Sequence, residues 1–140
     1  MLSKGDVALL VDDSSDAVRA RDFAASFSLV TKELGFEPKF YLAHGGVIPR
    51  QTESEFLDDV RGARVVVIYL APWHDAEMEA NRASRILLNT SNLDNKHVLA
   101  YSNSAASEAS WLGVGLKSVD VSDVHEFEAA LRRDLKELAS

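Results

Sequence analysis

The chain has 140 residues, the size of one domain, so a two-domain enzyme with a cleft between lobes is not expected. A composition of 46% hydrophobic and 26% charged residues excludes a disordered or collagen-like chain. The lack of cysteine excludes disulfides and cysteine-ligated zinc and agrees with a reducing compartment. Because 22 acidic residues outweigh 15 basic ones, binding to a nucleic-acid backbone is disfavoured. We therefore expect residues 1–140 to form a single cytoplasmic domain.

The first half of the chain alternates short apolar strands with helices. Residues 7–11 form an apolar run that ends in turn- and cap-forming residues, as a buried strand entering a helix does. Apolar residues then recur at helical spacing, namely Phe23, Phe27, Val30 and Leu34. Gly35 follows as a helix stop signal, and a second strand is predicted over residues 38–43. Residues 52–55 have the form of a capping box and open a short helix that closes at Gly62.

The second half continues the alternation. Residues 65–70 are the most β-prone stretch, and their continuous apolarity indicates a central strand covered on both faces. A helix is predicted over about residues 76–88, a fourth strand over residues 97–102, and a weaker fifth strand over residues 116–121. Asp123 can cap a last helix, whose apolar residues keep one stripe over four turns.

This order predicts a three-layer, doubly wound α/β domain with a five-stranded parallel sheet. Right-handed crossovers leave few topologies, and the flavodoxin-like strand order 2-1-3-4-5 is the commonest for five strands. In such sheets ligands bind beyond the carboxyl ends of the strands, at the switch point between the first and third strands. The candidate site therefore comprises residues 12–16, 44–49 and 71–79.

Several familiar kinds of site are not predicted. Neither glycine-rich phosphate-binding signature occurs, and a turn that needs positive φ is the favoured explanation of Gly45 with Gly46. The serine-rich residues 102–107 lack the nucleophile elbow of a hydrolase. No membrane-spanning segment or signal peptide is expected. The histidines show no ligand spacing and predict no metal site; they are His44, His74, His97 and His125.

A longer pattern spans about residues 6–102. It comprises Asp-Ser-Ser-Asp at residues 13–16 after the first strand, the proline-containing loop 46–49 after the second, and Trp73 four positions before Glu77 after the third. In this order and spacing the chain resembles a Toll/interleukin-1 receptor (TIR) domain, although the family's cysteine and its terminal Phe-Trp box are missing. The resemblance implies either cleavage of NAD at the nicotinamide–ribose bond or assembly with similar domains as a non-enzymatic signalling adaptor.

The resemblance also implies roles for particular residues. Glu77 or Glu79 would be the catalytic carboxylate; both flank the expected buried face of their helix, so the choice stays open. An alternative interpretation is that these acids only place negative charge in a first helical turn. The residues expected to bind the nucleotide are Asp12, Asp13, Ser14, His44, Gly45, Gly46, Trp73 and His74. NAD would be a substrate, no cofactor is expected, and a protein partner would be a second copy or another TIR-like domain.

A shorter resemblance supports a third hypothesis. Residues 9–13, Leu-Leu-Val-Asp-Asp, are similar to the opening of response-regulator receiver domains, in which such an acidic pair holds Mg²⁺. A receiver carries its phosphoacceptor aspartate at the end of the third strand, where this chain has Leu70 and Ala71. Without that carboxylate no aspartyl phosphate can form there, so this alternative is a degenerate receiver.

Overall fold

The computed structural model describes residues 4–13, 17–42, 53–70, 96–102, 118–121 and 123–139. Its strands are β1 (Val7–Asp13), β2 (Glu37–Leu42), β3 (Ala63–Leu70), β4 (His97–Ser102) and β5 (Ser118–Asp120). Its helices are α1 (Ala17–Glu33), α2 (Glu53–Gly62) and α6 (Val124–Ala139). The predicted helix over residues 76–88 and the capping residue Thr52 lie outside the described residues.

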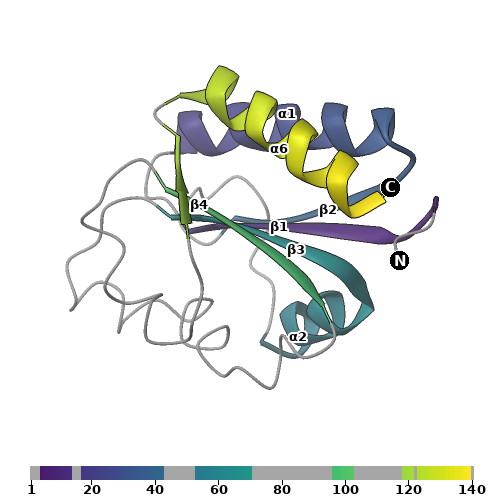
Figure 1. The fold of residues 1–140 in the computed structure, drawn as a ribbon. Helices are drawn as coiled ribbons and strands as arrows, with labels where there is room; N and C mark the ends of the chain where they lie inside the picture. Colours follow the sequence, from purple (N-terminus) through teal and green to yellow (C-terminus); the bar gives the residue numbers. More distant parts are fainter. Residues whose placement is uncertain are drawn as a thin grey trace.

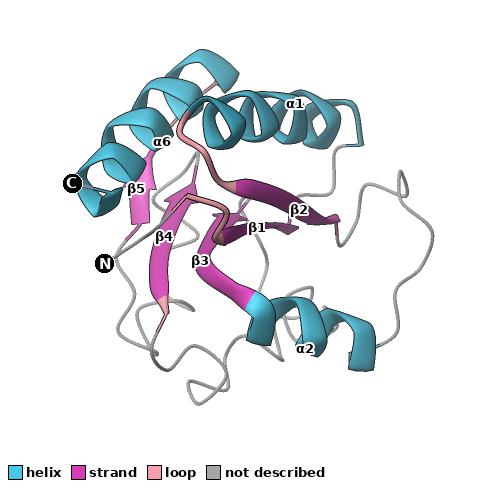
Figure 2. Ribbon diagram, turned by 90° about the vertical axis from the view of Figure 1, so that its right-hand side faces the viewer, coloured by secondary structure: helices cyan, strands magenta, loops and turns pink. Residues whose placement is uncertain are grey.

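The described strands form one parallel sheet in the order β2-β1-β3-β4-β5, as predicted. Helices α1 and α6 lie side by side on one face of this sheet, and α2 lies on the other (Figures 1 and 2). This arrangement confirms the three-layer, doubly wound α/β architecture. It also places β1 between its neighbours β2 and β3, which sets the position of the candidate site.

The middle strand of the sheet is β3, as its apolar sequence predicts. Every side chain from Val65 to Tyr69 is fully shielded from solvent. Because successive side chains of a strand point to opposite faces, this burial requires cover on both sides of the sheet. On the α1 and α6 side, Val67 and Tyr69 join the main hydrophobic cluster together with Leu10 of β1.

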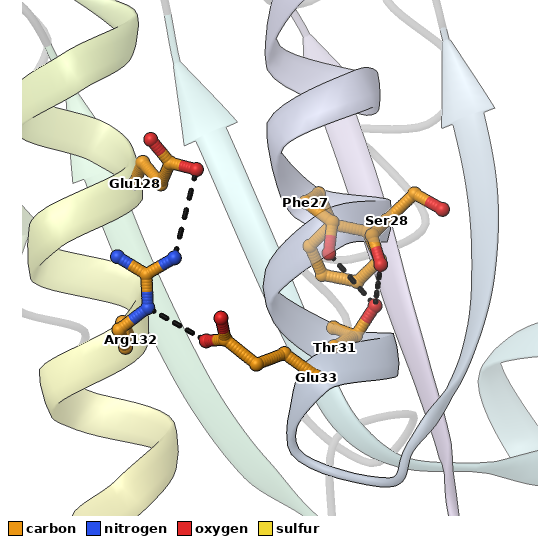
Figure 3. A network of polar contacts seen from close by, with 6 residues as sticks. All are labelled: Phe27, Ser28, Thr31, Glu33, Glu128 and Arg132. Carbon is orange, nitrogen blue, oxygen red and sulfur yellow. Dashed lines mark hydrogen bonds and ion pairs between the residues drawn. The ribbon is translucent and has the colours of Figure 1, made fainter.

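Helix α6 packs through one apolar stripe and is capped where the sequence predicts. The buried residues of this stripe are Phe127, Ala130, Leu131 and Leu135. Asp123 Oδ1 accepts a hydrogen bond from the Glu126 backbone N–H at 2.8 Å, which satisfies one of the free donors at the helix start. Arg132 links the two helices on this face of the sheet. Its guanidinium lies 2.7 Å from Glu33 of α1 and 3.7 Å from Glu128 of α6 (Figure 3). These exposed ion pairs add little to stability beside the apolar stripe.

The end of α1 is a Schellman motif built on Gly35. The backbone N–H of Phe36 donates to the carbonyl of Thr31 at 2.8 Å, and that of Gly35 donates to Lys32 at 3.1 Å. Gly35 has a φ of 88°, in the left-handed region that favours glycine, and Phe36 buries its ring directly afterwards. The predicted stop signal is therefore confirmed. On the same turn, Thr31 satisfies its buried hydroxyl by donating to the Phe27 carbonyl at 2.7 Å (Figure 3).

Replacing Gly35 with alanine should lower the free energy of unfolding by about 1–2 kcal/mol, because a side chain strains the left-handed backbone. The new Cβ would also lie 3.0 Å from Lys4 Cγ, but that flexible side chain can move. Urea unfolding measures the change. Gly62→Ala is the matched control, since Gly62 is helical and a Cβ there meets open space. We expect Gly62→Ala to be neutral or stabilising; equal effects of both variants would contradict the role of Gly35.

Several strand boundaries differ from the sequence-based prediction: β2 begins at Glu37 instead of Pro38, and β3 begins at Ala63 instead of Val65. Strand β1 continues two residues beyond Val11, because Asp12 and Asp13 pair with Tyr69 and Leu70 of β3. Strand β5 is described over Ser118–Asp120 and ends one residue before the predicted end at Val121, while residues 116 and 117 lie outside the described residues. These boundaries depend on which residues meet a partner strand, and a local apolar pattern does not record that.

Candidate functional site

The candidate site lies at the carboxyl edge of the sheet. In register, Asp12 pairs with Leu42 of β2 on one side and with Tyr69 of β3 on the other. Leu70, the last residue of β3, pairs with Asp13 of β1 and with Ser102 of β4. The ends of four parallel strands therefore meet at one edge, and two consecutive acidic residues stand in its centre.

This edge contains the topological switch point of the sheet. From β1 the chain continues to β2 on one side of β1 in the sheet, whereas from β3 it continues to β4 on the other side, so the strand order reverses between these two neighbours. Ligands of such sheets bind in the crevice beyond the carboxyl ends of the strands where the strand order reverses. The predicted adjacency of the first and third strands, on which the candidate site depends, is confirmed by their paired register from Val7 to Asp13.

Of the residues predicted for the site, Asp12 and Asp13 are those whose backbone is described. Both lie at the end of β1, next to β3, where the prediction requires them. The other predicted site residues lie outside the described residues; they are Ser14, His44, Gly45, Gly46, Trp73, His74, Glu77 and Glu79. Their roles, including the choice between Glu77 and Glu79, stay predictions.

An aromatic cluster, comprising Phe23, Tyr69, Tyr101 and Phe127, lies on the α1 and α6 face near the carboxyl edge. The ring of Phe23 lies 4.3 Å from that of Tyr69 and meets Phe127 edge-on at 4.9 Å. Phe127 in turn lies edge-on to Tyr69 at 6.0 Å and to Tyr101 at 5.5 Å. All four side chains are fully buried. Edge-to-face pairs such as those of Phe127 stabilise a core beyond the area they bury, so the cluster stabilises the core on this face of the sheet.

This aromatic cluster is not evident from the sequence. Tyr69 and Tyr101 each stand one residue before the end of an apolar strand, and the two are paired in register. The shared position of the two tyrosines can be read from the sequence. It predicts that they lie side by side only once β3 and β4 are known to be neighbours. Phe127 belongs to the apolar stripe predicted for the last helix, but that stripe does not specify its aromatic partners.

Tyr101 also forms a partly buried polar contact between the sheet and α6. Its hydroxyl donates to Asp134 Oδ2 at 2.7 Å, and Arg133 Nε donates to Asp134 Oδ1 at 3.1 Å. Burial of the ring, and then the hydrogen bond to the Asp134 carboxylate, raise the pKa of Tyr101 well above its ordinary value of 10.0. The phenol therefore stays protonated at every physiological pH.

At the amino edge of the sheet, Lys96 bonds to the junction between α2 and β3. Its ammonium donates to the carbonyls of Arg61 at 3.0 Å and Ala63 at 2.7 Å, which satisfies acceptors left open where the helix ends. Partial burial and then the nearby Arg64 guanidinium lower the pKa of Lys96. This contact lies at the amino edge of the sheet, away from the candidate site, and has a structural role.

Other site types receive no support within the described segments. Among the residues that the structure describes, no group of three or more histidine, aspartate or glutamate side chains is placed to hold a metal ion. In the same part of the chain, no helix has both the length and the apolar character needed to cross a bilayer.

Comparisons with known proteins identify the fold of the chain but match it to no family. No protein-family model matches the chain, and a search of curated proteins finds no similar sequence. Among solved structures, a mutant of the flavo di-iron protein from Thermotoga maritima is similar, with a TM-score of 0.67 and 20% sequence identity. The similarity covers 97% of this chain but 36% of that protein, so this chain spans about a third of its length. The chain is thus similar in fold to part of a larger flavo di-iron protein and has a flavodoxin-like fold.

Proposed function

We propose that this domain binds a nucleotide in the crevice beyond the carboxyl ends of β1 and β3. The observation that carries the proposal is the register that sets Asp12 and Asp13 beside the last residues of β3 at the switch point. Ligands of doubly wound sheets bind at this position. A carboxylate after the first strand is suited to accept hydrogen bonds from ribose hydroxyls, and it does not need a glycine-rich phosphate loop.

The first candidate ligand is a nicotinamide nucleotide. It follows from the resemblance of the sequence to TIR domains, in which a helix glutamate acts on NAD. In this chain Glu77 or Glu79 would stabilise the positive charge that develops on the ribose as nicotinamide leaves, and Trp73 would stack on a base. The reaction would be NAD cleavage at the nicotinamide–ribose bond, in a signalling role.

The second candidate ligand is a flavin nucleotide. The observation in its favour is the fold similarity to a protein whose name includes a flavin-type group together with a di-iron group. Flavin mononucleotide binds at the β1/β3 switch point of flavodoxin, which has the strand order found here. Both candidates use the same edge of the sheet, so one set of binding experiments compares them.

Calorimetric titration of the full chain with NAD and, separately, with flavin mononucleotide tests the proposal. We expect saturable binding of one of them, and we expect the double variant Asp12→Asn, Asp13→Asn to bind about tenfold more weakly, a loss of about 1.4 kcal/mol. Asp58→Asn is the matched control, because Asp58 is an exposed carboxylate of α2 paired only with Arg61 in the described structure. This control should bind as the unmodified chain does.

Nicotinamide release, followed by chromatography, separates the two candidates. If NAD is the substrate, Glu77→Gln or Glu79→Gln should abolish release while binding persists. Binding of flavin without NAD turnover would favour the second candidate. Failure of both ligands to bind, or equal affinity of the Asp12/Asp13 variant and the Asp58 control, would overturn the proposal.

A further inference from the structure

A tyrosine–carboxylate pair joins the core of the protein to its surface. The Tyr101 side chain has no exposed surface, and its hydroxyl donates to Asp134 Oδ2 at 2.7 Å. The Asp134 side chain is 17% exposed, so the carboxylate reaches solvent although the phenol does not. Arg133 occupies the other carboxylate oxygen, Oδ1. Oδ2 is therefore the acceptor that the described structure provides for the phenolic proton.

This geometry matters for electron transfer. A phenol that loses one electron becomes a strong acid, so oxidation of a buried tyrosine is favourable only when a base within hydrogen-bond distance takes the proton. The raised pKa of Tyr101 ensures that the proton is present before oxidation. Water cannot serve as the base for a side chain without exposed surface, whereas Asp134 is already hydrogen-bonded to it.

We propose that Tyr101 and Asp134 form a proton-coupled redox site that donates one electron to a one-electron oxidant, such as an excited flavin, at the carboxyl edge of the sheet. In this step the Tyr101 O–H bond breaks, the electron passes to the oxidant, and the proton forms a new O–H bond at Asp134 Oδ2. The products are a neutral tyrosyl radical, a protonated Asp134 and the one-electron-reduced oxidant. Charge balances, because the carboxylate loses its negative charge as the oxidant gains one electron.

The aromatic cluster provides a route between this pair and the carboxyl edge. The Phe127 ring contacts both tyrosines of the cluster. Its centroid lies 5.5 Å from that of Tyr101 and 6.0 Å from that of Tyr69. Tyr69 is paired in register with Asp12, the acidic residue at the switch point. An electron that leaves Tyr101 for an oxidant at the edge thus passes through closely packed rings. Transfer of the phenolic proton to Asp134 then keeps the radical on Tyr101.

The test oxidises the full chain from solution, so it does not rest on the proposed function. A laser flash with tris(bipyridyl)ruthenium(II) and a sacrificial electron acceptor generates a ruthenium(III) oxidant, and electron paramagnetic resonance with transient absorption follows the radical. We expect a neutral tyrosyl radical whose yield falls at least about tenfold in Tyr101→Phe. Tyr41→Phe is the matched control, because Tyr41 contacts Phe56 of α2 at 4.3 Å and lies outside the aromatic cluster.

The rate of radical formation tests the role of the Asp134 carboxylate. Asp134→Asn should slow radical formation about tenfold, and in the unmodified chain radical formation should slow in deuterated water, because the proton moves with the electron. The isotope measurement needs no variant, so it applies whether or not Asp134→Asn folds. An unchanged radical yield in Tyr101→Phe, formation at the same rate in Asp134→Asn, or the absence of an isotope effect would each overturn the proposal. A positive result without any nucleotide binding would contradict the proposed function alone.

Discussion

Replacing Phe127 with alanine should lower the free energy of unfolding by about 3–5 kcal/mol, the usual cost of deleting a fully buried aromatic ring. Phe127 has no exposed surface and contacts Phe23, Tyr69 and Tyr101 edge-on. The substitution therefore removes the ring of α6 that contacts both β3 and β4 and leaves a cavity among the remaining three rings. Urea unfolding with linear extrapolation measures the loss.

Leu29→Ala is the control for this prediction. Leu29 also lies on a helix of the same face, but its side chain is 57% exposed. Its truncation should change stability by no more than about 0.5 kcal/mol. A loss below about 1.5 kcal/mol for Phe127→Ala, or similar losses for both variants, would show that the aromatic cluster does not hold the domain together as described.

Alkaline pH should destabilise the protein through Tyr101. Burial and the hydrogen bond to Asp134 raise the pKa of this phenol in the folded state above its ordinary value of 10.0, whereas in the unfolded chain it keeps that value. Below about pH 10 the phenol is protonated in both states and adds no pH dependence. Above it, the unfolded chain releases the proton and the folded protein does not, so stability falls by about 1.4 kcal/mol for each further pH unit.

The measurement compares urea unfolding of the unmodified chain and Tyr101→Phe at several values between about pH 9 and about pH 11.5. Lysines and the other tyrosines titrate equally in both proteins, so the difference between the two curves isolates Tyr101. We expect Tyr101→Phe to be less stable at neutral pH, because Asp134 loses its hydrogen bond, and to lose stability less steeply above about pH 10. Parallel curves over the whole range would contradict the role assigned to burial and Asp134.

Both predictions concern the same face of the sheet as the proposed redox pair. A domain destabilised by Phe127→Ala could still form the tyrosyl radical if Tyr101 and Asp134 remained hydrogen-bonded, but the route through the ring would be lost. Radical yield and stability therefore report different properties of one cluster. The nucleotide titrations concern the edge of the sheet and use variants outside this cluster.

The sequence by itself determined the order and type of the described elements. Local chemistry is sufficient for this, because helical spacing from Phe23 to Leu34, the stop at Gly35 and the cap at Asp123 act within a few residues along the chain. The apolarity of residues 65–70 also predicted a strand buried on both faces. The alternation of strands and helices also predicted the strand order and the edge where a ligand would bind, because few topologies satisfy right-handed crossovers.

Only the tertiary structure decided which distant residues meet. The extension of β1 to Asp13, the ring contacts of Phe127 and the hydrogen bond of Tyr101 to Asp134 each join segments far apart in sequence. Their geometry depends on the register between strands and on the rotation of α6 about its axis. Neither leaves a periodic signature along the chain, because a one-residue change in register alters every contact while the apolar pattern stays the same.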